Sequence, residues 1–185
     1  YFSYKDEGFF FNNPRIWDVL FSFRKGLFIY CPILIISFIG LFLSYKKKYF
    51  IAVLTYTLIN IFLVSSWWCW WYGGSFGMRA LVQSYAVMAF PMAFVINYLF
   101  SKPLLKKIST GVISFLILLS LTQTYQFSHN FIHWDAMTKK AYTFSLFNFK
   151  YDPDERAYFD SVLNHPNYEG AKKGKSEETF ERNLT

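Results

Sequence analysis

The sequence predicts an all-α fold: a polytopic membrane bundle of about four transmembrane helices, followed by a small helical tail that faces water. Three observations predict it. Hydrophobic residues make up 54% of the 185 residues and aromatic residues 23%, a share that suits membrane interfaces better than soluble domains. The chain also contains four long uncharged runs, at residues 26–45, 49–78, 80–101 and 108–134. Finally, the net charge of +7 is unevenly distributed.

Each uncharged run is long enough for a helix that crosses the bilayer, which takes about 20 apolar residues. Backbone groups in lipid must form their hydrogen bonds within their own segment, so helices are expected. We expect spans at residues 26–45, 49–66, 80–100 and 108–127. The chain then divides into an outer segment (1–25), a four-helix transmembrane region (26–127), an outer helical tail (128–169) and a disordered terminus (170–185).

The distribution of charge indicates membrane topology and excludes a nucleic-acid partner. Residues 1–127 hold eleven Lys and Arg against three Asp and Glu, whereas residues 128–185 hold eight against nine. The basic excess therefore belongs to the apolar part of the chain. Lysines cluster between the first two spans (46–48) and the last two (102, 106 and 107). Short lysine-rich loops stay cytoplasmic, so the N-terminal segment, residues 67–79 and the tail are expected outside. Arg24 and Lys25 count against this orientation.

In the tail, Asp152, Pro153 and Glu155 predict a helix start with a capping box, and the helix should end before Pro166. A weaker helix is expected from residue 135 to about 147. The last residues, 170–185, are polar, and disorder is expected there.

Two cations, Arg24 and Lys25, precede the first span, and Gly26 opens it. A helix start beside two cations suits a phosphate group, although plain anchoring at the membrane interface explains them as well. The spans themselves contain no Asp, Glu, Lys or Arg at mid-membrane, which disfavours an ion-coupled pump.

The loop at residues 67–79 is the second candidate site. Its aromatic and glycine residues can contact a sugar ring or an isoprenoid chain, or can form an aromatic belt that closes a helical hairpin; they are Trp70, Trp71, Tyr72, Gly73 and Gly74. Arg79 is the single charge between residues 49 and 101, so it is expected to have an anionic partner.

A third candidate, Asp135, could cap a helix, ligate a metal or act as a base, and capping is favoured. His129 and His133 have the spacing of a helical metal pair, but no third ligand is evident, so no metal site is predicted. Cys31 and Cys69 fit two small buried apolar residues, with a disulfide left open.

Three segments together carry a resemblance to a known family: LFSFRKGLFIYCP (20–32), WWYGGSFGMR (70–79) and IHWDAMTKKAY (132–142). They resemble the C-terminal half of bacterial multi-spanning membrane glycosyltransferases of the GT-C type, related to protein O-mannosyltransferases and aminoarabinose transferases. The resemblance covers roughly residues 10–145. It implies a polyprenyl-phosphate sugar donor, membrane lipid as a neighbour, and transfer on the outer face of the bacterial cytoplasmic membrane.

The resemblance also bears on the site residues. Arg24, Lys25 and Arg79 become candidate contacts to the donor phosphate. In such enzymes the catalytic acidic residue lies in an earlier outer loop, and this chain, which begins at Tyr1, is expected to be a fragment without it. No cofactor is predicted, and a divalent metal remains open. Two other functions remain open: a non-catalytic membrane scaffold, and a transporter of lipid or polysaccharide.

Overall fold

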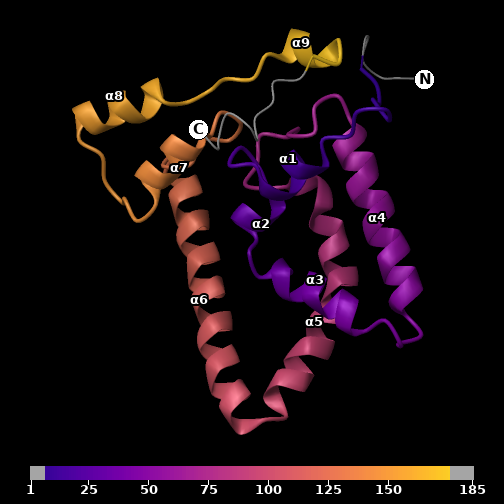
Figure 1. The fold of residues 1–185 in the computed structure, drawn as a ribbon. Coiled ribbons are helices and arrows are strands. Elements are labelled where there is room, and N and C mark those ends of the chain that lie inside the picture. The colour runs from indigo at the N-terminus through magenta and orange to yellow at the C-terminus, as the bar shows by residue number, and fades with distance from the viewer. Residues whose placement is uncertain (1–6, 176–185) are drawn as a thin grey trace.

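The structure is a computed structural model, and it describes residues 7–175 (Figure 1). Within that range the regular elements are helical, as the sequence predicts, and one isolated antiparallel bridge joins Phe9 to Trp67. The helices, of which η1 is a 3₁₀ helix, are α1 (Ile16–Phe21), α2 (Leu27–Tyr30), α3 (Leu34–Leu43), α4 (Phe50–Ser66), η1 (Arg79–Ser84), α5 (Tyr85–Phe100), α6 (Pro103–Ser128), α7 (Lys139–Ser145), α8 (Pro153–Ser161) and α9 (Tyr168–Lys172).

Two of the four expected spans form helices that are long and apolar enough to cross a membrane. They are Arg79–Phe100, which joins η1 to α5 over 22 residues, and α6, with 26 residues. The second expected span, α4, is apolar but has 17 residues. The first is divided into α2 and the ten-residue α3. Pro32 explains the division, because the residue before a proline is driven out of the helical conformation, and Cys31 has φ −136° and ψ 63°.

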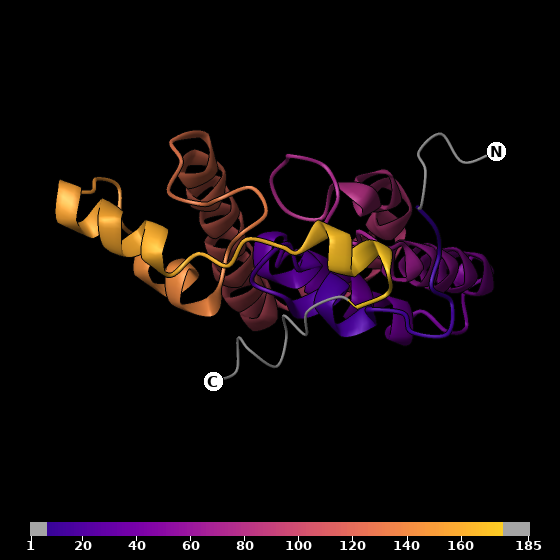
Figure 2. The ribbon, with the colours of Figure 1, turned by 90° about the horizontal axis from the view of Figure 1, so that it is seen from above.

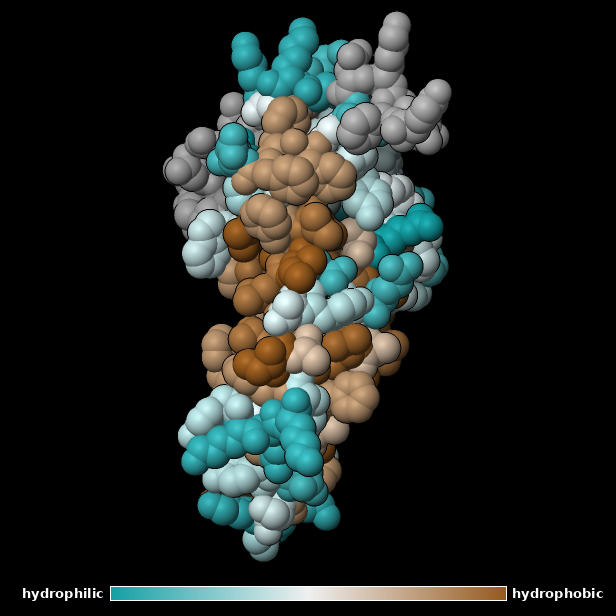
Figure 3. All heavy atoms as spheres, turned by 90° about the vertical axis from the view of Figure 1, so that its right-hand side faces the viewer, coloured by the Kyte–Doolittle hydropathy of each residue, from teal (hydrophilic) through white to brown (hydrophobic). Residues whose placement is uncertain are grey.

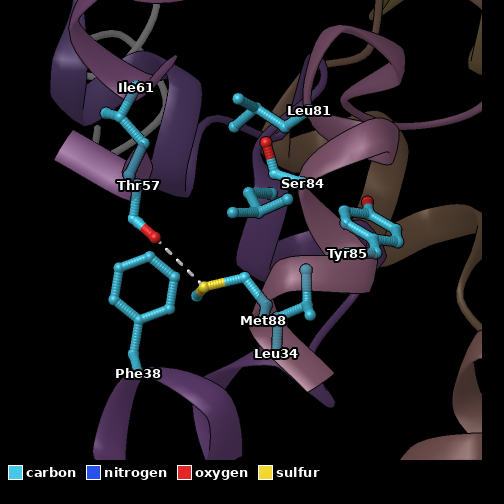
Figure 4. Close-up of a pocket in the computed structure, with 9 residues that line it drawn as sticks. Leu34, Phe38, Thr57, Ile61, Leu81, Ser84, Tyr85 and Met88 are labelled. Atoms are coloured by element: carbon cyan, nitrogen blue, oxygen red, sulfur yellow. Dashed lines mark hydrogen bonds between the residues drawn. The ribbon is translucent and has the colours of Figure 1, made fainter. Parts of the chain in front are cut away.

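Helix α3 packs tightly along α5, where Gly40 faces Pro91. A Cβ atom at Gly40 would lie 2.1 Å from the Pro91 carbonyl oxygen, so the two backbones approach more closely than any side chain allows. A small apolar cavity of about 20 Å³ lies nearby, among side chains from α2, α3, α4, η1 and α5 (Figure 4). There the Thr57 hydroxyl donates to the Met88 sulfur at 3.4 Å. These contacts join α3, α4 and α5 into one packed group.

The outer surface of this helical body is apolar. In the space-filling view, brown surface covers most of the middle of the visible face and is interrupted by a strip of paler residues, while hydrophilic residues gather above and below (Figure 3). Helix α6 is the extreme case, since only 6% of its most apolar stretch is buried. Its exposed side chains include Leu104, Phe115, Leu118 and Leu121. A core helix of a soluble protein would be largely covered, so α6 has the surface expected of a helix in contact with lipid.

The two ends of the body differ in what they carry (Figure 1). The connections from α3 to α4 and from α5 to α6, which hold the lysine clusters, both lie at the lower end. The loop between α4 and η1, the short helix α1 and the tail helices lie at the upper end. Seen from above, α9 lies over the body while α8 projects beyond α6 (Figure 2). The two lysine clusters thus share one end, while the side of the membrane that each end faces stays a prediction.

The tail follows the sequence expectation in one helix and departs from it in two. Helix α8 begins at Pro153 with the complete Asp152–Glu155 capping box and ends at Ser161, before Pro166. Helix α7 begins at Lys139 and is capped by Thr138, so the expected helix start and cap at Asp135 are wrong. Helix α9 reaches into the terminus expected to be disordered, and residues 176–185 of that terminus lie outside the described residues.

Candidate functional site at the loop between α4 and η1

A tight turn between α1 and α2 positions Arg24 and Lys25. The amide of Gly26 donates to the Ser22 carbonyl at 2.6 Å, and a Cβ atom at Gly26 would lie 2.5 Å from that oxygen. Only glycine fits there, because any side chain would overlap the backbone of the turn. Both cations are buried, with 2% of Arg24 and 1% of Lys25 exposed. Burying a charged side chain requires compensating partners, which the neighbouring segments supply.

Lys25 joins the turn to the glycine loop, because its ammonium group donates to the Gly73 carbonyl. Gly73 has φ +84°, a conformation that favours glycine, and a Cβ atom there would lie 3.4 Å from Cδ of Arg79. Burial lowers the pKa of Lys25 to about 8; the negative charge of Asp135 partly opposes this, while Arg79 and Arg24 add to it. The structure therefore brings Lys25 and Arg79 to the same glycine.

Arg79 is the exposed member of the cation group. Its backbone amide donates to the Gly77 carbonyl, where the chain turns at φ +58°. Within residues 7–175 its guanidinium forms no hydrogen bond or ion pair. The anionic partner expected for Arg79 is thus not found in the described part of the chain, and its side chain is exposed.

Arg24 faces the tail instead. Its Nη1 donates to the Asp135 carbonyl at 2.7 Å and its Nη2 to the Asn164 carbonyl at 3.1 Å. Its guanidinium also lies over the Trp71 ring, 5.4 Å from the centroid. Arg24 thereby fastens two segments that are far apart in sequence, the loop after α6 and the connection from α8 to α9.

Asp135 is buried beside two histidines and a tyrosine. Its Oδ2 accepts a hydrogen bond from the Tyr168 hydroxyl at 2.7 Å, and its Oδ1 lies 3.2 Å from Nδ1 of His133. Burial, with the hydrogen bond to Asp135 as a second cause, raises the pKa of Tyr168 to about 12. Burial also lowers the pKa of His133, so this imidazole is favoured in its neutral form. Potential metal-ligating atoms of His133, Asp135 and His165 all lie within 4.8 Å of one another.

The aromatic candidates separate into buried and exposed members. Trp70 and Trp71 lie in the hydrophobic core, with 1% and 4% of their surface exposed. Tyr72 is exposed and lines a largely apolar groove of about 520 Å³. The other residues that line this groove are Glu7, Phe9, Leu63, Val64, Trp67, Trp68 and Cys69. Gly74 is exposed too, and a Cβ atom there would meet the Trp134 ring at 3.7 Å. In this arrangement Tyr72, Gly73 and Gly74, rather than the two tryptophans, border open space.

The site contains residues that the sequence did not single out. Asn164, His165 and Tyr168 come from the tail, at least 26 positions after the end of the loop at 129–138, and no spacing pattern links them to Asp135. The histidine pair that spacing did indicate is not formed, because α6 ends at Ser128 and His129 stacks on Tyr125 with 4.0 Å between the ring centroids. The two cysteines are free thiols, and burial raises the pKa of Cys69 to about 12.

Comparison of this chain with models of known protein families, with curated proteins and with solved structures finds no match.

Proposed function

We propose that this chain is part of a membrane glycosyltransferase that moves a sugar from a polyprenyl-phosphate donor to an acceptor outside the cytoplasmic membrane. The observation that carries the proposal is the pairing of two cations at one glycine turn. Lys25 holds the Gly73 carbonyl, and Arg79 lies against the same residue with its guanidinium free within residues 7–175. A planar guanidinium beside an ammonium group suits the oxygens of a phosphate.

The bilayer is the first part of the proposal. Helix α6 and the continuous η1–α5 segment cross it, and α3 and α4 complete a bundle of four. The apolar surface of Figure 3 and the exposed apolar side chains of α6 support this arrangement, because apolar surface of that extent is otherwise covered by a partner. We place the lysine-rich lower end in the cytoplasm, following the excess of Lys and Arg in cytoplasmic loops, and the upper end outside.

Donor binding is the second part. The isoprenoid chain would lie in the largely apolar groove lined by Trp67, Trp68 and Tyr72, the last of which directly precedes Gly73 in the sequence. The phosphate would then reach Arg79, which follows Gly73 in the same loop, and Lys25, whose ammonium group donates to the Gly73 carbonyl from the turn between α1 and α2. Arg24 is the third cation proposed for the donor; because carbonyls of Asp135 and Asn164 already hold it, we assign it the task of positioning the loop.

The reaction would be a direct displacement at the anomeric carbon. A bond forms from the acceptor oxygen to that carbon, the bond to the phosphate oxygen breaks, and polyprenyl phosphate leaves with the electron pair. The acceptor proton passes to an acidic residue, which we place outside this chain segment. Fixed cations at the departing phosphate would stabilise its developing charge, a form of stabilisation that often dominates catalysis.

The test is sugar transfer from a polyprenyl-phosphate donor by the complete protein in liposomes, with equal amounts of each variant. Arg79→Ala should lower kcat/KM at least about tenfold, because a hydrogen bond to a charged group contributes about 1.5–3 kcal/mol. Arg79→Lys keeps the charge but loses the fork that holds two oxygens, so its loss should be intermediate. Arg156→Ala is the matched control, since Asp160 engages that arginine in α8.

The outcome also separates the alternative functions. If the protein is a scaffold, the unaltered protein transfers no sugar, and Arg79→Ala therefore behaves in the same way. A transporter predicts movement of the lipid-linked sugar across the liposome membrane without transfer to an acceptor. Normal transfer and normal donor affinity in Arg79→Ala would overturn the assignment of the phosphate site.

A further inference from the structure

The cluster around Asp135 is separate from the cation pair at Gly73. We propose that His133, Asp135 and His165 bind a divalent transition-metal ion of the Zn²⁺ class, which links the loop after α6 to the tail. One potential ligand atom from each residue lies within 4.8 Å of the other two. Two imidazoles and one carboxylate are a ligand set that suits zinc.

The closest pair of atoms in the cluster has the spacing of two ligands on one ion. Nδ1 of His133 and Oδ1 of Asp135 are 3.2 Å apart. Two ligands bound tetrahedrally at about 2.0–2.1 Å lie about 3.3 Å from each other. The hydrogen bonds to Nδ1 show whether a proton lies between these two atoms. The backbone amides of Asp135 and Ala136 donate to Nδ1 of His133 at 3.3 and 3.1 Å. A nitrogen that accepts from two N–H groups carries no proton, so Nδ1 does not donate to the carboxylate.

The carboxylate supplies a second, independent observation. Asp135 is 2% exposed, and its Oδ1 is a buried oxygen with no hydrogen-bond donor in the described part of the chain. Tyr168 donates to Oδ2, which fixes the carboxylate so that Oδ1 is directed at His133. A buried anionic oxygen that faces a lone pair is unfavourable unless a cation lies between them. A metal ion would satisfy Oδ1 and replace the long amide contacts on Nδ1.

His165 completes the set from the other segment. Its ring lies 5.3 Å from that of His133, centroid to centroid, and perpendicular to it. It is exposed, so an ion can reach the cluster from solvent, and water can occupy the remaining coordination position. The tyrosine bonded to the ligating carboxylate has the role of outer partner that fixes ligand orientation in metal sites.

The position of the ion gives it a structural consequence. His133 and Asp135 follow α6, and His165 lies in the connection from α8 to α9. Arg24 joins the same two segments through the carbonyls of Asp135 and Asn164. The metal would therefore be a second fastening of the tail to the upper end of the body.

The experiment is metal binding by the complete protein in detergent, after treatment with a chelator, using Zn²⁺ titration and the visible absorption of Co²⁺ as probe. One ion per chain should bind, and Co²⁺ should give the spectrum of a low-coordinate site with nitrogen ligands. His165→Ala and His133→Ala should each weaken Zn²⁺ binding at least about tenfold, since even outer partners contribute about 10–100-fold. Tyr168→Phe should weaken it by about tenfold for the same reason.

His129→Ala is the matched control, because His129 is exposed on the same loop and hydrogen-bonds Ser128 and the Tyr125 carbonyl instead. It should leave both the affinity and the Co²⁺ spectrum unchanged. Because His165 is exposed, its replacement is not expected to disturb folding, and that variant carries the test if His133→Ala does not fold. Zn²⁺ affinity that is equal in the unaltered protein and in His165→Ala would overturn the proposal, as would an equal loss in His129→Ala.

Discussion

The two ends of the helical body hold their cations in opposite ways. At the lower end, six lysines are exposed, in the connections before α4 and α6 and in the start of α6; they are Lys46, Lys47, Lys48, Lys102, Lys106 and Lys107. At the upper end, Arg24 and Lys25 are buried, and each donates to carbonyls of a distant segment. An exposed lysine loses little hydration on folding, whereas a buried one must replace its water with protein partners. Within residues 7–175 the lower lysines form no side-chain hydrogen bond or ion pair, and some of them lie over aromatic rings, such as Lys47 over Phe94 at 5.2 Å. Arg24 and Lys25 are instead hydrogen-bonded parts of the packed interior.

This difference shows how, in an apolar chain, charges that set membrane orientation can be told apart from charges that hold a site together. Charge counting treats both ends alike, since each adds to the same basic excess. Only the partners distinguish them: the upper cations contact Gly73, Asp135 and Asn164, which come from three separate segments. The predictions below test whether that distinction holds, beginning with the largest expected effect.

Replacing Arg24 should have the largest effect. Arg24→Ala removes the donors to the Asp135 and Asn164 carbonyls and the contact with Trp71. Because a buried acceptor without a partner costs about 1–3 kcal/mol, we expect about 2–4 kcal/mol of lost stability and earlier proteolytic release of the tail. Thermal unfolding and limited proteolysis in detergent measure both. Lys46→Ala at the lower end is the control and should be silent; equal losses in the two variants would remove the distinction between the ends.

Next in size is the glycine turn that Lys25 holds. Gly73→Ala places a side chain at φ +84°, a left-handed conformation that costs about 1–2 kcal/mol for other residues. Gly74→Ala is the adjacent control, because Gly74 lacks a positive φ and its Cβ would make an ordinary 3.7 Å contact with Trp134. We expect a lower unfolding temperature for Gly73→Ala alone. Equal unfolding temperatures in the two variants would show that the turn does not need glycine at position 73.

The pH dependence of stability should show the burial of Lys25. Its pKa is about 8 in the folded protein against 10.5 for an ordinary lysine, so between those values the unfolded chain binds more protons. Stability from this group therefore rises as pH increases from about 8 to 10.5, and it does not change below pH 7. Between pH 7 and 10, the unfolding temperature of the unaltered protein should rise relative to that of Lys25→Met. Lys46→Met provides the baseline, and a difference that stays constant with pH would contradict the assignment.

The sequence predicts the helical class, and the placement of both lysine clusters at one end of the body, better than it predicts the four spans. Long uncharged runs identify α5 and α6, because spanning length is a property of composition. The division between α2 and α3 depends on a single proline, Pro32, which a hydropathy average conceals. Similarly, the capping box of α8 involves only Asp152 and Glu155, three residues apart, and the sequence predicts it correctly. The start of α7 at Thr138 follows a loop that Arg24 holds through the Asp135 carbonyl, and this distant contact is not visible in the sequence.

The sequence predicts only those residues of the candidate site that are close to one another along the chain. Arg24, Lys25 and the glycine loop stand out because charge is rare in an apolar chain. Their mutual contacts, and the whole of the tail's contribution, depend on folding: nothing in the spacing of His165 and Tyr168 relates them to Asp135. Aromatic residues mislead for the same reason, since Trp70 looks like a ligand contact in the sequence and lies in the core.

The smallest effect on stability, and the last test of the comparison, is expected at the lower end. Replacing the lysines at residues 46–48 with Gln should change stability by less than about 1 kcal/mol, because the side chains are exposed and exposed cation–π contacts, here Lys46 with Tyr45 and Lys47 with Phe94, contribute about 0.5–1 kcal/mol. The same change should nevertheless alter the orientation in which the protein inserts into the membrane, because Lys and Arg in cytoplasmic loops set that orientation. A single cysteine at Ser75, with Cys31 and Cys69 replaced, reports the side of the upper end through an impermeant thiol reagent. We expect labelling from outside in the parent protein and a mixed population after the lysines are removed. If the parent is labelled only once the cytoplasmic face is opened, the orientation is reversed. If instead the lysine variant unfolds as readily as Arg24→Ala, the lower cations belong to the fold after all, and the contrast between the two ends fails.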